Sequence, residues 1–108
     1  MLIETSDIRG YKLMRIGQGN FTEKDLDDIR DLVAGHLKRR VDKIALCFDA
    51  KAYPYSKLIT LLIKCDSLAK EAGADLAIIQ PNEDFADILT GMKLTSVVRL
   101  LDSEDALE

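Results

Sequence analysis

The residue whose type and position allow the most chemistry is Ser56, at the predicted start of a helix that continues with an apolar run from Leu58. As an N-cap, its hydroxyl would accept a hydrogen bond from a free backbone N–H and stabilise the helix by about 1 kcal/mol. As a phosphoacceptor, it would carry a phosphate among the same N–H groups, at the positive end of the helix dipole, without melting the helix. The two functions are compatible, so Ser56 is both a candidate cap and a candidate phosphorylation site.

The other residues that could do chemistry lack the partners that such chemistry needs. His36 falls in a predicted helix with no nucleophile and acid arranged around it, and is expected to be solvated or half-buried. Cys47 and Cys65 have no Cys-x-x-Cys spacing, which argues against a zinc site or a disulfide framework and favours two small buried side chains. We therefore expect no catalytic constellation, no metal and no cofactor.

Two further features bear on alternative functions. Asp49 ends a predicted strand, as the phosphoacceptor of a receiver domain does, and ligands of open α/β sheets bind at such strand ends. A receiver also needs an acidic pair after its first strand, where this sequence has Gly17-Gln18-Gly19-Asn20. These glycines do not extend to Gly-x-Gly-x-x-Gly, because Thr22 occupies the third glycine position. A receiver-like or ligand-sensing α/β domain stays open as an alternative.

The charge balance and the apolar pattern each exclude a class of partner. The sequence has 15 Lys and Arg against 19 Asp and Glu, a formal charge of −4, whereas a nucleic-acid-binding module of this size carries a basic excess. No window approaches the ~18 apolar residues that cross a bilayer, and the N-terminus lacks the pattern of a signal peptide. We expect one cytoplasmic domain over residues 1–108, with no nucleic acid and no membrane insertion.

Strand-like and helix-like segments alternate along the chain. The nearly continuous apolar run 43–49 indicates a strand covered on both faces, and the stripe of Leu26, Ile29, Val33 and Leu37 indicates an amphipathic helix. The alternation predicts an α/β fold with a mixed, mostly parallel sheet of four to five strands flanked by about four helices. The predicted strands cover residues 2–8, 11–16, 43–49, 75–80 and 97–101, and the predicted helices begin at Thr22, near Ser56, at Glu83 and at Ser103.

The helix from Ser56 carries apolar residues outside its core stripe. On a helical wheel, Ile59 and Ile63 lie away from that stripe. They either pack against a neighbouring helix or form an exposed apolar strip beside Ser56, to which Tyr53 and Tyr55 add aromatic area. Exposed aromatic and aliphatic side chains of this kind are typical anchors of a protein interface.

Five segments follow one another in an informative order. A strand ends in Phe48-Asp49, residues 52–62 combine a hydroxyl with an apolar helix, and Gly73 precedes a strand. Residues 88–92 end a helix much as Leu-x-x-Gly-Leu would, and residues 101–107 contain Asp-Ser followed by Glu-x-Ala-Leu. Together these segments resemble the STAS family, the domain of anti-sigma factor antagonists and of sulfate-transporter tails, over nearly the whole chain. The resemblance implies a STAS-like fold that works by binding rather than by catalysis.

The sequence departs from that family at the phosphoacceptor motif. Where the family has Asp-[Ser/Thr]-[Ser/Thr]-Gly, this chain has Pro54-Tyr55-Ser56-Lys57. The second hydroxyl, which is the usual phosphoacceptor in members switched by phosphorylation, is the one that remains, so the resemblance gives this role to Ser56. A phosphate there would add about −1.5 to −2 charges to a docking surface, and Lys57 would neutralise part of that charge.

The resemblance implies an anti-sigma factor antagonist of a bacterial partner-switching system. Unphosphorylated, the protein would bind an anti-sigma factor that is also a GHKL-type serine kinase; phosphorylated, it would let go, and a PP2C-type phosphatase would reset it. The alternative of another class is a STAS scaffold subunit, never phosphorylated, in a larger transporter or signalling complex. The expected partner-binding residues of this monomer or weak dimer are Tyr53, Pro54, Tyr55, Ser56, Lys57, Ile59 and Ile63.

Overall fold

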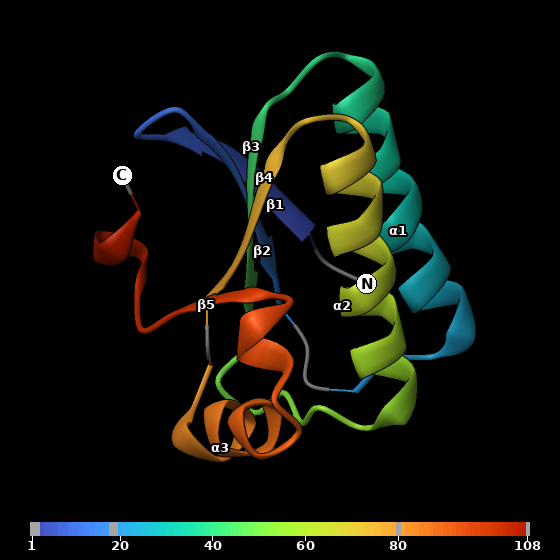
Figure 1. Ribbon diagram of the computed structural model, residues 1–108. Coiled ribbons are helices and arrows are strands. Elements are labelled where there is room, and N and C mark those ends of the chain that lie inside the picture. The colour runs from blue at the N-terminus through green and yellow to red at the C-terminus, as the bar shows by residue number, and fades with distance from the viewer. Residues whose placement is uncertain (1–2, 18–19, 80, 108) are drawn as a thin grey trace.

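The structure is a computed structural model that describes residues 3–17, 20–79 and 81–107. Figure 1 shows a twisted sheet with two long helices along one side and a third helix across one end. In chain order the elements are β1 (Ile3–Ile8), β2 (Tyr11–Ile16), α1 (Glu23–Lys38), β3 (Lys43–Phe48), α2 (Ser56–Glu71), β4 (Asp75–Ile79), α3 (Glu83–Gly91), the 3₁₀ turn η1 (Leu94–Ser96), β5 (Arg99–Leu101) and the 3₁₀ turn η2 (Glu104–Ala106).

The sheet is mixed and mostly parallel, as the sequence predicts. Its strand order is β1-β2-β3-β4-β5, with β1 and β2 antiparallel and each later pair parallel. Arg9 and Gly10 form the two-residue loop between β1 and β2 with φ values of 51° and 85°, the positive values that a type I′ turn needs. This strand order differs from the 2-1-3-4-5 order of receiver domains, so the receiver alternative does not fit the fold.

The main core lies between the sheet and the helices α1 and α2, which run beside each other on one face (Figure 1). Each of these helices joins two neighbouring parallel strands, which places both helices on the same side of the sheet. The predicted stripe of α1 is confirmed, because Leu26, Ile29 and Val33 are buried and Leu37 is half-buried. The strands supply Met14, Ile16, Ile44, Leu46, Phe48, Leu76 and Ile78 to this core, and α2 supplies Leu58, Leu61, Leu62, Cys65 and Ala69.

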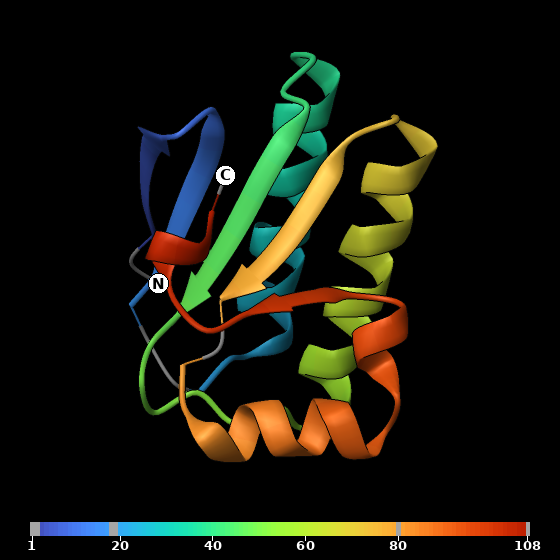
Figure 2. The same ribbon diagram turned by 60° about the vertical axis from the view of Figure 1, so that its left-hand side comes forward.

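The opposite face of the sheet has a smaller core, over which the C-terminal segment lies. Figure 2 shows this segment in red, passing in front of β2 and β3 on the side away from α1 and α2. Its Leu107 is 1% exposed and packs with side chains from the middle of the sheet. These are Tyr11, Leu13, Ala45, Ala77 and Ile79.

Side-chain caps begin two of the three helices. Thr22 and Asp25 form the predicted capping box of α1: the Thr22 Oγ1 accepts from the Asp25 N–H at 3.1 Å, and the Asp25 carboxylate accepts from the Thr22 N–H at 3.0 Å. Asn82 caps α3 by accepting from the Phe85 N–H at 2.8 Å. Its amide group also donates to the carbonyl groups of Ala50 and Ala52, at 2.9 and 3.1 Å. Asn82 thereby fixes the loop between β3 and α2 against α3.

The C-terminal third differs from the prediction in two places. Strand β5 begins at Arg99 instead of residue 97, because Lys93 adopts a left-handed backbone (φ 60°) and the chain then forms η1. The segment after Ser103 forms a 3₁₀ turn instead of the first turn of an α-helix. The described residues therefore contain three α-helices where about four were expected. Parts of three predicted segments, Leu2, Gln18, Gly19 and Gln80, lie outside the described residues.

The three phenylalanines of the chain pack together at the end of the sheet where the parallel strands end. Phe48, at the end of β3, meets Phe21 edge to face (ring centroids 6.1 Å apart) and stacks on Phe85 of α3 (5.9 Å apart). Phe48 and Phe85 are buried, at 4% and 0% exposed, whereas Phe21 is half-buried. The trio joins the segment before α1, the end of β3 and the helix α3.

Substitution of the central ring should cost more stability than substitution of an outer one. We expect Phe48→Leu to lower the free energy of unfolding by about 1–2 kcal/mol, because it removes two aromatic contacts in a buried site. Phe21→Leu removes one contact of a half-buried ring and should cost less than half as much. Urea unfolding followed by circular dichroism measures both values, and equal losses would contradict the central position of Phe48.

His36 lies in the last turn of α1 and is half-buried, as expected. Its Nε2 atom is buried and has no hydrogen-bond partner among the described residues. Burial lowers the pKa of His36 below the ordinary value of 6.5, and the nearby cations Lys12 and Arg39 lower it further, against a smaller opposite effect of Asp7. The folded protein therefore favours the neutral ring.

This lowered pKa makes part of the stability depend on pH. The contribution of the neutral ring is complete above the unfolded pKa, near 6.5, and is lost as the pH falls through the lower folded pKa. We expect the melting temperature of His36→Gln to fall less between pH 7.5 and pH 5 than that of the unchanged protein. The ring proton signals of this single histidine give its pKa directly by NMR, and a value of 6.5 or more would contradict the inference.

Candidate functional site

The amino end of α2 places Ser56 at the surface. Ser56 is the first residue of the helix and is exposed, and the residue in the N-cap position is Tyr55, whose backbone is extended (φ −72°, ψ 168°). The expected N-cap function of Ser56 is therefore wrong, because its hydroxyl lies one residue too far along the helix. Tyr55 makes no side-chain capping bond, and the first turn of α2 contains no acid. α2 thus begins without the side-chain acceptor that Thr22 and Asn82 give to the other two helices.

The loop that leads to Ser56 is fixed by a turn within it and by a hydrogen bond to the segment before α1. The Asp49 carboxylate accepts from the Lys51 N–H at 2.9 Å, which uses this acid in a turn. The Tyr55 hydroxyl donates to the backbone carbonyl of Phe21 at 2.9 Å. Pro54 is buried, whereas Tyr53 is 56% exposed. Of the expected interface aromatics, Tyr53 therefore presents its ring to solvent and Tyr55 uses its hydroxyl to hold the loop.

The expected apolar strip on α2 is only partly present. Ile59 is 8% exposed and belongs to the main core. Of the two alternatives for this residue, packing inside the protein is therefore correct and an exposed position is wrong. Ile63, one turn further, is 37% exposed. Beyond it, the buried Asp66 pairs with Lys70 at 2.8 Å, and Lys70 also donates to the carbonyl of Val97 at 3.2 Å. This side of α2 is therefore the side on which the chain between α3 and β5 is held.

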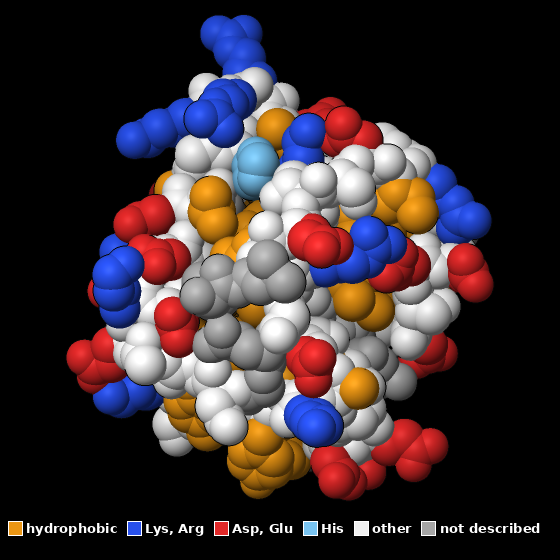
Figure 3. Space-filling model, turned by 180° about the vertical axis from the view of Figure 1, so that it is seen from behind, with side chains coloured by type: hydrophobic (Ala, Val, Ile, Leu, Met, Phe, Trp, Pro, Cys, Tyr) orange, Lys and Arg blue, Asp and Glu red, His pale blue; other side chains and the backbone are white. Residues whose placement is uncertain are grey.

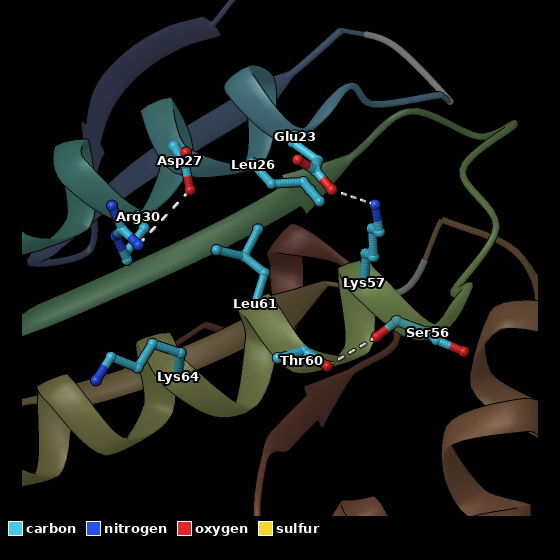
Figure 4. A pocket seen from close by; sticks show the side chains of 9 residues that line it. All are labelled: Glu23, Leu26, Asp27, Arg30, Ser56, Lys57, Thr60, Leu61 and Lys64. Atoms are coloured by element: carbon cyan, nitrogen blue, oxygen red, sulfur yellow. Dashed lines mark hydrogen bonds and ion pairs between the residues drawn. The ribbon is translucent and has the colours of Figure 1, made fainter.

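A groove of about 400 Å³ runs between α1 and α2 and has Ser56 at one end. Figure 4 shows Leu26 and Leu61 meeting between the helices, with charged side chains along the borders. The hydroxyl of Ser56 points away from α1, and its carbonyl accepts from the Thr60 Oγ1 at 3.0 Å (Figure 4). Ser56 thus borders the groove at one end, while its hydroxyl faces away from α1.

An ion pair closes the groove at its Ser56 end. The ammonium group of Lys57 in α2 contacts the carboxylate of Glu23, the first residue of α1. The pair lowers the carboxyl pKa of Glu23 and raises the pKa of Lys57. Both side chains are exposed. This contact was not predicted from the sequence. Two features could have indicated it: helices that follow neighbouring parallel strands begin at the same edge of the sheet, and Glu23 and Lys57 lie in the first turns of α1 and α2.

Removal of the lysine should release the acid without unfolding the protein. We expect Lys57→Met to raise the carboxyl pKa of Glu23 toward its ordinary value of 4.5, with little change in melting temperature, because exposed pairs contribute little to stability. A pH titration of the Glu23 side-chain signal by NMR measures the shift. Lys64→Met is the matched control in the same helix and groove, and an equal shift in both variants would show that the contact with Lys57 is not the cause.

A second concave site, of about 290 Å³, lies on the other face of the sheet near the ends of β2 and β3. There the carboxylate of Glu104 is held by the guanidinium group of Arg15 and lies 3.9 Å from the Cys47 Sγ. Cys47 is half-buried rather than buried, and burial raises the pKa of its thiol. Cys65 is buried as predicted, and burial raises its pKa to about 12. Both thiols are protonated at neutral pH, which makes them poor catalytic nucleophiles and slow to react with alkylating reagents.

The described residues, 3–17, 20–79 and 81–107, form neither a metal-binding cluster nor a helix that could span a membrane. No group of three or more His, Cys, Asp and Glu residues among them is placed to hold a metal ion. Within the same ranges, no helix combines the length and the apolar character needed to cross a membrane. Seen from behind (Figure 3), acidic, basic and apolar side chains are interspersed over the surface.

Comparison with known proteins identifies the fold. No family model matches the sequence, and no curated protein matches it. Among solved structures, the fold matches TM1081 of Thermotoga maritima, described as a candidate anti-sigma factor antagonist, with a TM-score of 0.76 at 14% identity, covering 95% of this chain and 88% of that one. It also matches the anti-sigma factor antagonist SpoIIAA in its unphosphorylated form, with a TM-score of 0.66 at 8% identity over 96% and 91% of the two chains. The phosphorylated form of SpoIIAA from Bacillus gives 0.66 at 9% identity over 97% and 96%.

The chain therefore has a STAS-like α/β fold, the fold of anti-sigma factor antagonists, and the predicted fold class is confirmed. Of the solved structures named above, SpoIIAA is described as an anti-sigma factor antagonist and TM1081 as a candidate one. At 8–14% identity the likeness concerns the fold.

Proposed function

We propose that this protein is a protein-binding regulatory module, an anti-sigma factor antagonist whose partner binding is controlled by phosphorylation of Ser56. The observation that carries the proposal is the position of Ser56: an exposed hydroxyl residue that begins α2 of a STAS-like fold. A structural neighbour of the same fold is known in both an unphosphorylated and a phosphorylated form. The proposed location is the bacterial cytoplasm.

The partner in this proposal is an anti-sigma factor that is also a serine kinase of the GHKL type. The unphosphorylated protein binds it and thereby frees the sigma factor; phosphorylation breaks the complex, and a PP2C-type phosphatase restores it. The exposed residues around Ser56 that meet the partner are Tyr53, Lys57 and Ile63. Pro54, Tyr55 and Ile59 are buried or half-buried, and they support this surface by fixing the loop and the first turn of α2.

The local electrostatics support a switch that acts on the interface and leaves the fold intact. A phosphate on Ser56 adds about −1.5 to −2 charges at a helix start, where free N–H groups and the dipole favour negative charge. The first turn of α2 contains no acid that would repel it. Lys57 is already engaged by Glu23, so the added charge faces the partner with less neutralisation than the sequence suggests.

The proposal is tested with a GHKL-type serine kinase of the source organism. Incubation with that kinase and ATP should add one phosphate, and mass spectrometry should locate it on Ser56. Ser56→Ala should abolish the modification, whereas Ser67→Ala, an exposed serine of the same helix, should leave it unchanged. Ser56→Asp should weaken binding to the kinase and keep the circular dichroism spectrum.

A scaffold function is the second candidate, favoured by the replacement of the family's acid and glycine by the buried Pro54 and the paired Lys57. In that function Ser56 is never phosphorylated and the module stays bound within a larger assembly. The same experiment separates the two candidates. Absence of phosphate on Ser56, together with unchanged kinase binding by Ser56→Asp, would reject the switch and leave the scaffold.

A further inference from the structure

The segment that follows β5 covers the second face of the sheet with a single buried apolar side chain. We call residues 102–107 the strap. Leu107 is 1% exposed and lies in the small core of that face, whereas the five residues before it are exposed or half-buried. The strap crosses in front of β2 and β3, on the side away from α1 and α2 (Figure 2).

Two arginines of the β1–β2 hairpin hold the strap. Arg9 donates from Nη1 to the carbonyl groups of Asp105 and Leu107, at 2.7 and 3.2 Å. Arg15 donates from Nε and Nη2 to the two carboxylate oxygens of Glu104, at 3.1 and 2.5 Å. The side chains of this second pair are 44% and 30% exposed. Because exposed charges are screened by salt, the Arg15–Glu104 pair weakens as ionic strength rises.

The strap has few other attachments in the described part of the chain. The backbone bonds of its turn run from the Ala106 N–H to Ser103 and from the Leu107 N–H to Glu104, both within the strap. The helix-covered core, in contrast, is formed by buried residues from three strands and three helices. Segments with few buried apolar contacts and exposed anchors open locally at a lower free energy than the whole domain.

We propose that the strap opens as a unit, by separation of Glu104 from Arg15 and withdrawal of Leu107, while the helix-covered core stays folded. Opening uncovers Cys47, whose Sγ lies under the Glu104 carboxylate, together with the apolar residues around Leu13. The apolar residues of this second face are thus exposed only while the strap is open, and they lie on the opposite side of the sheet from the groove between α1 and α2. Opening of the strap does not involve Ser56 and is independent of the function proposed for that residue.

The two cysteines report the two kinds of opening separately. Cys47 lies beneath the strap on the second face, and Cys65 belongs to α2 and is fully buried in the helix-covered core. Iodoacetamide labelling followed by peptide mass spectrometry measures the rate at each thiol in one sample. We expect Arg15→Met, or a rise from 0.05 to 0.5 M NaCl, to speed labelling of Cys47 by about two- to fivefold, with Cys65 unchanged. Leu107→Ala should speed Cys47 by more than Arg15→Met.

Arg30→Met is the matched control, because Arg30 is an arginine of similar exposure, 42%, that pairs with Asp27 and Asp31 on the surface of α1. It should leave the labelling of Cys47 unchanged, and this comparison is made on Cys47 alone because Arg30 lowers the pKa of the Cys65 thiol. Hydrogen exchange gives a second readout: in Arg15→Met the amides of Ala106 and Leu107 should exchange faster, and those of α1 and α2 at the same rate as before. Equal acceleration at Cys47 and Cys65 would mean global unfolding and would overturn the proposal. So would labelling of Cys47 that responds neither to Arg15→Met nor to salt.

Discussion

The end of the fold that carries Ser56 depends on the packing of Phe48 between Phe21 and Phe85. Phe48 is the last residue of β3, and the loop to α2 begins directly after it. A ring fixed on both sides sets where that loop starts, and Asn82 and Tyr55 then fix its course by hydrogen bonds to three backbone carbonyl groups. The position of Ser56 therefore depends, through this loop, on aromatic packing at the end of the sheet.

The main elements were accessible from the sequence because each rests on a local pattern. The apolar run of β3 and the stripe of α1 describe the faces that these elements bury, and the Thr22 capping box closes within four residues. Contacts between elements far apart in the sequence were not accessible. Ile59 is buried by residues of other elements, although it lies outside the core stripe of its own helix. A helical wheel shows only the residues of one helix and therefore does not predict this burial. The shift of the cap from Ser56 to Tyr55 is a difference of one residue, below the precision of any helix boundary inferred from sequence.

Several charged side chains of this protein connect one secondary-structure element to another. Lys57 and Glu23 connect α2 to α1, and Arg15 and Glu104 connect β2 to η2. Lys70 connects α2 to the backbone of Val97. These groups lie at the edges of the two cores and are largely exposed, except for Asp66 beside Lys70. Ionic strength and protonation therefore act on how elements dock, while apolar burial sets whether they form.

The two hydrogen bonds of Arg9 have a consequence for the order in which the molecule is completed. They join residues 96 and 98 positions apart, so the first hairpin of the chain is bonded to its last described residues. Contacts of such separation can form only when residues 105–107 have come back to the hairpin, and closing a loop of that length costs conformational entropy. During synthesis, Arg9 leaves the ribosome long before Asp105 and Leu107 and lacks these two carbonyl partners until they emerge. The small core of the second face is consequently covered only after the strands and helices between residues 9 and 105 have been made.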